Sequence, residues 1–189
     1  RGGGRGARGG GGAMDPEERR GPAMGEGREI RVALEDMKFS AAHFVAFRGF
    51  REPLHGHNYT VGVRAGGTML QADGYLADFG DVKKVVRVAC KQINNRTIVP
   101  TRSDVLSVQV QRGADGRGGQ VEIGCEDGGR MVLPEADCVL LPIVHSSAEE
   151  LAEHLWWDIL VAQKLASILA ARGVEWLEVS VSERPGQGA

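Results

Sequence analysis

Three histidines have the types and spacing of a metal site. His43 stands alone, while His55 and His57 flank a single glycine. Alternate residues of a β-strand point to the same face and lie about 6–7 Å apart along it. A pair with this spacing also arises by chance, but His43 at the end of a neighbouring strand would complete a set of three. Three protein ligands with an open fourth position are typical of catalytic zinc, although imidazole also suits copper, iron and nickel.

The strands that would carry these histidines show alternating apolar residues. Residues 30–34 and 59–63 each alternate apolar with polar or small side chains, which is typical of half-buried strands. We expect the two stretches to pair antiparallel. A long loop over about residues 44–54 would lie between them.

Two helices are predicted by apolar stripes at helical spacing. The first begins after Asp78, which can cap it, and ends at Asn94 and Asn95. The second begins after Ser146 or Ser147 and runs as one helix to Gly173, a residue suited to a helix C-terminus. Its expected buried stripe consists of Leu151, Leu155, Ile159, Ala162, Leu165, Ala166 and Leu169.

Residues 105–140 indicate an inserted β structure, with glycine-rich turns at residues 113–119 and 127–129. A last strand is expected over residues 176–181. Two long helices on one face of an antiparallel sheet give an α+β fold with a β-rich insertion.

The N-terminal segment differs from the rest in composition. Residues 1–28 are rich in Arg and Gly and poor in large apolar side chains, so we expect a disordered tail followed by one domain over residues 29–189. The tail could bind RNA, or it could be a leader or translated upstream sequence.

Net charge, the length of apolar runs and the cysteine content argue against several classes of protein. A net charge of -2 makes nucleic-acid binding by the whole chain an unfavoured reading. No apolar run has the roughly 20 residues that a membrane span needs. Three widely spaced cysteines predict reduced thiols, and with no secretory signal we expect a cytoplasmic protein.

Five short segments occur in the order of a known family. FSAAH at 39–43, HGHNY at 55–59, DFGDVKK at 78–84, SSAEELA at 146–152 and the late Glu183 resemble the 6-pyruvoyltetrahydropterin synthase and 6-carboxytetrahydropterin synthase family over about residues 30–185. The resemblance implies the T-fold (tunnelling fold), assembled as a homo-oligomer of three or six subunits. It also implies a Zn²⁺ ion on His43, His55 and His57 and a small-molecule pterin substrate, 7,8-dihydroneopterin triphosphate.

The resemblance implies that glutamates anchor the pterin ring. The matching positions are Glu149 and Glu183. A carboxylate can accept two parallel N–H bonds from the edge of the ring. The structural alternatives are that Glu149, like Glu150, only complements the helix dipole and that Glu183 is a solvated charge.

One departure from the family concerns the catalytic base. The usual cysteine before HGH is missing, and Glu52 stands three residues before His55. This arrangement resembles a branch with glutamate in place of cysteine, which cleaves the side chain to 6-hydroxymethyl-7,8-dihydropterin, a folate precursor. The simpler interpretation of Glu52 is a loop carboxylate paired with Arg48 or Arg51.

A second departure is the absence of the family's Asp-His pair after the first helix, where Asn94 and Asn95 stand. His145 could serve as proton donor or be structural, and His154 is expected to be structural. The resemblance predicts a zinc-dependent lyase. The alternatives are triphosphate elimination to 6-pyruvoyltetrahydropterin on the tetrahydrobiopterin route, a 6-carboxytetrahydropterin synthase, and a pterin-binding protein without catalysis.

Overall fold

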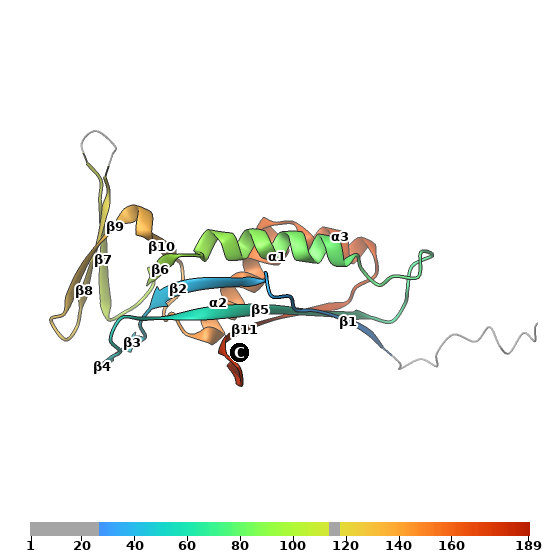
Figure 1. Ribbon diagram of the computed structural model, residues 1–189, viewed down its shortest axis with the longest axis horizontal. Coiled ribbons are helices and arrows are strands. Elements are labelled where there is room, and N and C mark those ends of the chain that lie inside the picture. The colour runs from blue at the N-terminus through green and yellow to red at the C-terminus, as the bar shows by residue number, and fades with distance from the viewer. Residues whose placement is uncertain (1–26, 114–117) are drawn as a thin grey trace, which may run out of the picture.

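A seven-stranded sheet forms the centre of the fold in the computed structural model, which describes residues 27–113 and 118–189 (Figure 1). The strand path runs β10-β6-β2-β5-β11-β12, and β1 also pairs with β5. The strands are β1 (Arg28–Val32), β2 (Lys38–His43), β5 (His55–Gly67), β6 (Arg96–Pro100), β10 (Cys138–Leu141), β11 (Trp176–Arg184) and β12 (Gln187–Gly188). The predicted tail lies outside the described residues up to residue 26.

The long strand β5 organises the sheet. As predicted, β1 pairs with it antiparallel, with Val32 opposite Val63. β2 and β11 are also antiparallel to β5, whereas β6 runs parallel to β2 and to β10. The α+β class and the T-fold are therefore confirmed, with a sheet that is mixed at one side.

The first helix forms as the sequence predicts. α1 (Phe79–Ile93) begins where the Asp78 carboxylate accepts a hydrogen bond from the Gly80 N–H at 2.6 Å. Its apolar stripe is buried against the sheet, and the helix ends at Asn94.

The prediction of one continuous second helix was wrong. The chain forms α2 (Ala148–Trp157), a π-helical turn over Asp158–Ala162, and α3 (Leu165–Ala171). The Gln163 N–H bonds to the Asp158 carbonyl in the i to i+5 pattern, and Lys164 has a left-handed φ of 58°. This break shifts the stripe, so Leu151, Leu155, Ile159, Leu165 and Leu169 are buried while Ala162 and Ala166 are exposed.

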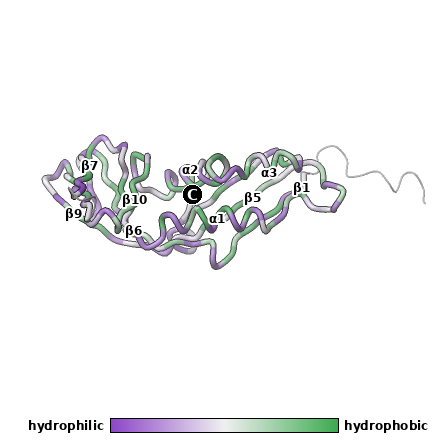
Figure 2. The backbone as a smooth tube through the Cα atoms, turned by 90° about the horizontal axis from the view of Figure 1, so that it is seen from above, coloured by the Kyte–Doolittle hydropathy of each residue, from purple (hydrophilic) through white to green (hydrophobic). Residues whose placement is uncertain are grey.

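The predicted insertion forms a separate sheet at one end of the molecule (Figures 1 and 2). Its strands β7 (Leu106–Gln111), β8 (Gln120–Cys125) and β9 (Arg130–Pro134) pair antiparallel in sequence order. Gly128 makes the predicted second turn with a φ of 82°. The predicted first turn falls in part on residues 114–117, outside the described residues. A one-turn 3₁₀ helix (Glu135–Asp137) then leads into β10.

The loop expected near residues 44–54 contains a short hairpin, β3 (Ala46–Phe47) and β4 (Phe50–Arg51). This hairpin and the insertion share a small apolar core that includes Ala46, Val121 and Ile123. The main core lies between the sheet and the helices, which cover one face of it (Figure 1).

The three cysteines are free thiols, as predicted, with Cys90 and Cys138 buried and Cys125 partly buried. None of the helices in the described ranges has the length and apolar character of a membrane span.

Candidate metal centre and active site

The pleat of two neighbouring strands brings the three histidines together. His55, His57 and Tyr59 alternate along β5, so their side chains share one face of the sheet. On β2, His43 lies opposite His55 and Phe39 lies opposite Tyr59. The histidines therefore occupy the end of the same sheet face whose middle forms the apolar core.

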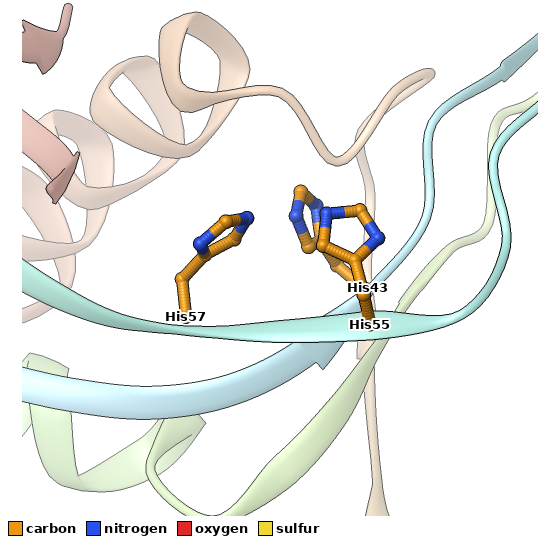
Figure 3. A group of neighbouring side chains, drawn as sticks. All are labelled: His43, His55 and His57. Atoms are coloured by element: carbon orange, nitrogen blue, oxygen red, sulfur yellow. The ribbon is translucent and has the colours of Figure 1, made fainter.

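The three imidazoles converge on one point (Figure 3). One ring nitrogen from each of His43, His55 and His57 lies within 4.8 Å of the others. The ring centroids are 4.6 Å apart for His43 and His55, 4.9 Å for His55 and His57, and 5.1 Å for His43 and His57. The structure thus brings together the three residues that the sequence proposed as ligands.

Backbone carbonyls orient two of the rings. The Nδ1–H of His43 can donate to the Ser146 carbonyl at 2.8 Å, and that of His55 to the Pro53 carbonyl at 2.8 Å. A carbonyl on Nδ1 fixes the tautomer that leaves the Nε2 lone pair free for a metal. Burial lowers the pKa of His43, which keeps this imidazole neutral near pH 7.

A second observation, independent of the spacing of the histidines, indicates that the site suits a metal ion. The Nε2 atom of His43 is buried and has no hydrogen-bond partner in residues 27–113 and 118–189. Leaving a buried polar atom unpaired costs free energy. Binding of a metal ion to the Nε2 atom of His43 would remove this cost. Three imidazoles with an open fourth position are the donor set typical of catalytic zinc.

Glu183 faces the same cluster. Its Oε1 lies 3.9 Å from His43 Nε2 and its Oε2 lies 3.8 Å from His57 Nε2. Glu183 lies near the end of β11, where the register with β12 shifts between Ser182 and Arg184. Such irregularities re-aim a side chain. The structure therefore places this carboxylate within the site rather than in solvent.

Tyr59 lies beneath the histidines and was missed as a site residue. Its ring is fully buried, stacks on Phe39 at 4.7 Å and lies 5.6 Å from the ring of His57. Burial, followed by the charges of Glu183 and Glu52, raises the pKa of the phenol. Its hydroxyl has no partner among the described residues. Its position two residues after His57 is the signal that could have found it.

Glu52 lies at the base of the β3–β4 hairpin. Its Oε2 accepts from the Val45 N–H at 3.0 Å, and its own N–H donates to the Val45 carbonyl at 2.9 Å. Arg51 pairs with Asp127 rather than with the Glu52 carboxylate. In the same way, Arg48 lies near Glu126 at 3.9 Å. The simpler interpretation, a Glu52 ion pair with either arginine, is therefore not what the structure shows.

The segment before α2 packs against the hairpin and the metal centre. The Nδ1–H of His145 can donate to the Ala46 carbonyl at 3.0 Å. Ser146 is fully buried, and its hydroxyl donates to the Phe44 carbonyl at 2.8 Å. Ser147, not Ser146, caps the helix. Sequence reasoning treated Ser146 only as a possible cap and missed its role in orienting His43.

The two glutamates at the start of α2 differ. Glu150 accepts hydrogen bonds from the Val144 N–H at 2.7 Å and the His145 N–H at 3.0 Å, so it shapes the loop. Glu149 is exposed in the single chain. His154 lies in mid-helix, partly buried, as expected of a structural histidine.

Asn94 and Asn95, which stand where the Asp-His pair of the family was expected, have a structural role. The Asn94 side-chain oxygen accepts from the Ser40 N–H at 2.8 Å, and the Asn95 N–H donates to the Ser40 carbonyl at 2.7 Å. These asparagines tie the end of α1 to β2.

Comparison with known proteins gives one consistent result. The family model described as 6-pyruvoyl tetrahydropterin synthase matches residues 32–189. A putative 6-carboxy-5,6,7,8-tetrahydropterin synthase of Methanocaldococcus jannaschii is 29% identical over 161 residues, which covers 85% of this chain and 93% of that protein.

Solved structures of Plasmodium enzymes are also similar. The 6-pyruvoyl tetrahydropterin synthase of Plasmodium vivax is 41% identical, with a TM-score of 0.78 over 87% of this chain and 96% of that one. The Plasmodium falciparum enzyme is 37% identical, with a TM-score of 0.79 over 86% and 95%. Further P. vivax structures carry alanine or cysteine in place of a glutamate described as a catalytic residue.

Proposed function

Because the chain belongs to the 6-pyruvoyl tetrahydropterin synthase family, we propose that it is a zinc-dependent lyase that acts on 7,8-dihydroneopterin triphosphate. The proposed products are 6-hydroxymethyl-7,8-dihydropterin and a phosphorylated two-carbon fragment. The observation that carries the proposal is the three-imidazole cluster faced by a carboxylate, Glu183, at the end of the sheet.

The residues divide the work of binding and proton transfer. His43, His55 and His57 hold the ion, which acts as a Lewis acid toward the side-chain hydroxyls of the substrate when bound. Glu183 accepts the N–H groups of the pterin edge, and Glu149 is proposed to assist it. Both roles require acceptor-only oxygens, which ionised carboxylates supply.

Glu52 is proposed as the general base. It accepts the proton of the side-chain hydroxyl on the second carbon, that carbon becomes an aldehyde, and the bond to the first carbon breaks. The electron pair passes into the ring imine, and a proton then returns to the first carbon. His145 is the proposed donor: its Nδ1–H is bonded to the Ala46 carbonyl, so its Nε2 is the nitrogen that takes up a proton from solvent and passes it to the first carbon.

The choice of product rests on the identity of the base. A glutamate is the residue described as catalytic in the P. vivax enzyme, which supports a catalytic glutamate here. The second candidate is triphosphate elimination to 6-pyruvoyltetrahydropterin, favoured by the name of the matching family model. The match to a putative 6-carboxytetrahydropterin synthase keeps that reaction as a third candidate.

Mass spectrometry of the products tests the proposal. Full-length protein with zinc is incubated with 7,8-dihydroneopterin triphosphate, and a chelated sample serves as control. We expect 6-hydroxymethyl-7,8-dihydropterin in the zinc sample alone. A 6-pyruvoyl or 6-carboxy product would replace the proposed reaction by an alternative, and unchanged substrate would indicate a binding protein.

A further inference from the structure

The proposed base Glu52 takes part, with its main chain and its side chain, in the hydrogen bonds at the base of the β3–β4 hairpin. The main chain of Glu52 bonds to Val45 at 2.9 Å, and the Glu52 carboxylate bonds to the Val45 N–H at 3.0 Å. One of the two Glu52–Val45 bonds at the base of the hairpin is therefore made by the side chain of the proposed base. Any movement of the hairpin moves the carboxylate.

The inserted sheet holds the hairpin from outside. The Nε–H of Arg51 donates to Asp127 Oδ2 at 2.8 Å, and the same guanidinium reaches the main-chain carbonyl of Glu52 at 3.3 Å. The Gly49 N–H at the hairpin tip donates to Glu126 Oε2 at 3.1 Å. Two consecutive carboxylates of the β8–β9 turn thus bind the hairpin. Glu126 binds its tip at Gly49, and Asp127 binds it through Arg51 on β4.

The turn is itself fixed. Asp127 Oδ1 accepts from the Gly129 N–H at 2.9 Å, and Gly128 adopts the left-handed φ of 82° that favours glycine. The Gly129 bond and the Arg51 guanidinium lower the pKa of Asp127, so its carboxylate is charged near neutral pH. The turn therefore holds the charged Asp127 carboxylate beside Arg51.

We propose that the Glu126–Asp127 turn is a latch that sets the position of Glu52, with Asp127 and Arg51 as positioning residues. The inference rests on the proposed function, since it takes Glu52 as the base. The insertion would then be part of the catalytic apparatus, although none of its described residues belongs to the histidine cluster. Misplacing a catalytic group by about 1 Å can cost on the order of 100-fold in rate.

The latch predicts a specific pattern of effects. The Asp127 side chain is 47% exposed, and exposed ion pairs contribute little to folding. Asp127→Asn should therefore leave Tm and zinc content near wild type and lower kcat roughly 10- to 100-fold, with little change in KM. Arg51→Gln should do the same. Because the two residues act through one contact, the double variant should be no slower than the slower single variant.

A matched control lies on the same insertion. Glu135→Gln removes the Arg112–Glu135 ion pair at 3.2 Å, and among the described residues no hydrogen bond or ion pair joins the Glu135 side chain to the hairpin. We expect this variant to keep the wild-type kcat. Wild-type kcat in Asp127→Asn, or additive losses in the double variant, would overturn the latch.

Hydrogen exchange separates the latch from the proposed function. The Val45 amide is protected by Glu52 Oε2, so Asp127→Asn should speed its exchange while leaving amides of the main sheet unchanged. If the wild type turns over no pterin but Val45 exchange rises, the latch stands and the proposed function fails. If Val45 exchange and kcat are both unchanged in an active enzyme, the latch is wrong.

Discussion

At the scale of the residue, chemistry depends on which atoms are left free. Carbonyl bonds to Nδ1 leave Nε2 of His43 and His55 available, and Glu183 faces the nitrogens of His43 and His57. Substitution of the histidines, of Glu183 and of Glu52 should therefore have different measurable effects.

The metal centre predicts a loss of zinc on substitution. His55→Ala or His57→Ala should reduce bound zinc from about one ion per chain to a small fraction, because two imidazoles bind far more weakly than three. Metal analysis of the purified protein measures this. His154→Ala should keep its zinc. Full occupancy in a variant lacking all three cluster histidines would refute the assignment.

Glu183 predicts weaker pterin binding. Glu183→Gln places an amide donor against N–H donors of the ring, a mismatch that costs about 1–3 kcal/mol, or roughly 5- to 150-fold in KM. Glu178→Gln on the same strand, where the carboxylate pairs with Arg64, is the control. Loss of zinc instead of loss of pterin affinity would identify Glu183 as a metal ligand.

Glu52 predicts a loss in kcat. Glu52→Gln keeps size and hydrogen bonding but removes the basic oxygen, so kcat should fall by about 10²- to 10⁴-fold with zinc retained. Glu35→Gln, at an exposed position, controls for loss of charge. Glu52→Cys should shift the product toward 6-pyruvoyltetrahydropterin. A wild-type rate for Glu52→Gln would move the role of base to His145.

At the scale of the element, the ends of helices and strands position the site. β2 ends at His43 and β5 begins at His55, while Ser146 lies just before the Ser147 cap of α2. The π-helical turn and Lys164 break the helix on the far side of the core, while Gly173 ends α3 with a φ of 75°.

Gly173 predicts a measurable cost in stability. Gly173→Ala would place a Cβ in ordinary contact with Gln71 Nε2 at 3.6 Å, so the penalty is that of the left-handed backbone. We expect a loss of about 1–2 kcal/mol in the free energy of unfolding. Gly27→Ala, at a glycine with no atom within 4 Å of the added Cβ, is the control for chemical denaturation. Equal midpoints for the two variants would contradict the expectation.

At the scale of the molecule, the main sheet ends in edge strands. β10 forms one edge of the strand path, and β12 forms the other. Exposed edges favour pairing with other chains. The family and these edges support a trimer or hexamer, in which the exposed Glu149 would meet a neighbouring subunit.

Light scattering of the full-length protein checks the assembly. We expect a mass three or six times the chain mass of 20.2 kDa. A stable monomer at micromolar concentration would contradict the proposed assembly.

The sequence by itself predicted the first helix, most of the strands and the three histidines of the candidate metal site. Short-range patterns were sufficient for α1, the turn at Gly128 and the histidine pair on β5, because each depends on residues near one another in the chain. The place of His43 at a neighbouring strand end and the family motifs both pointed to it as the third histidine, and the three side chains converge in the structure.

Only the tertiary structure decided the rest. It brought the Ser146 carbonyl to His43, broke the second helix at Lys164 and joined Arg51 to Asp127, 76 residues away. These features depend on contacts between distant segments and on how packing resolves competing local preferences. No spacing along the chain encodes such contacts, so they had to be read from the folded protein.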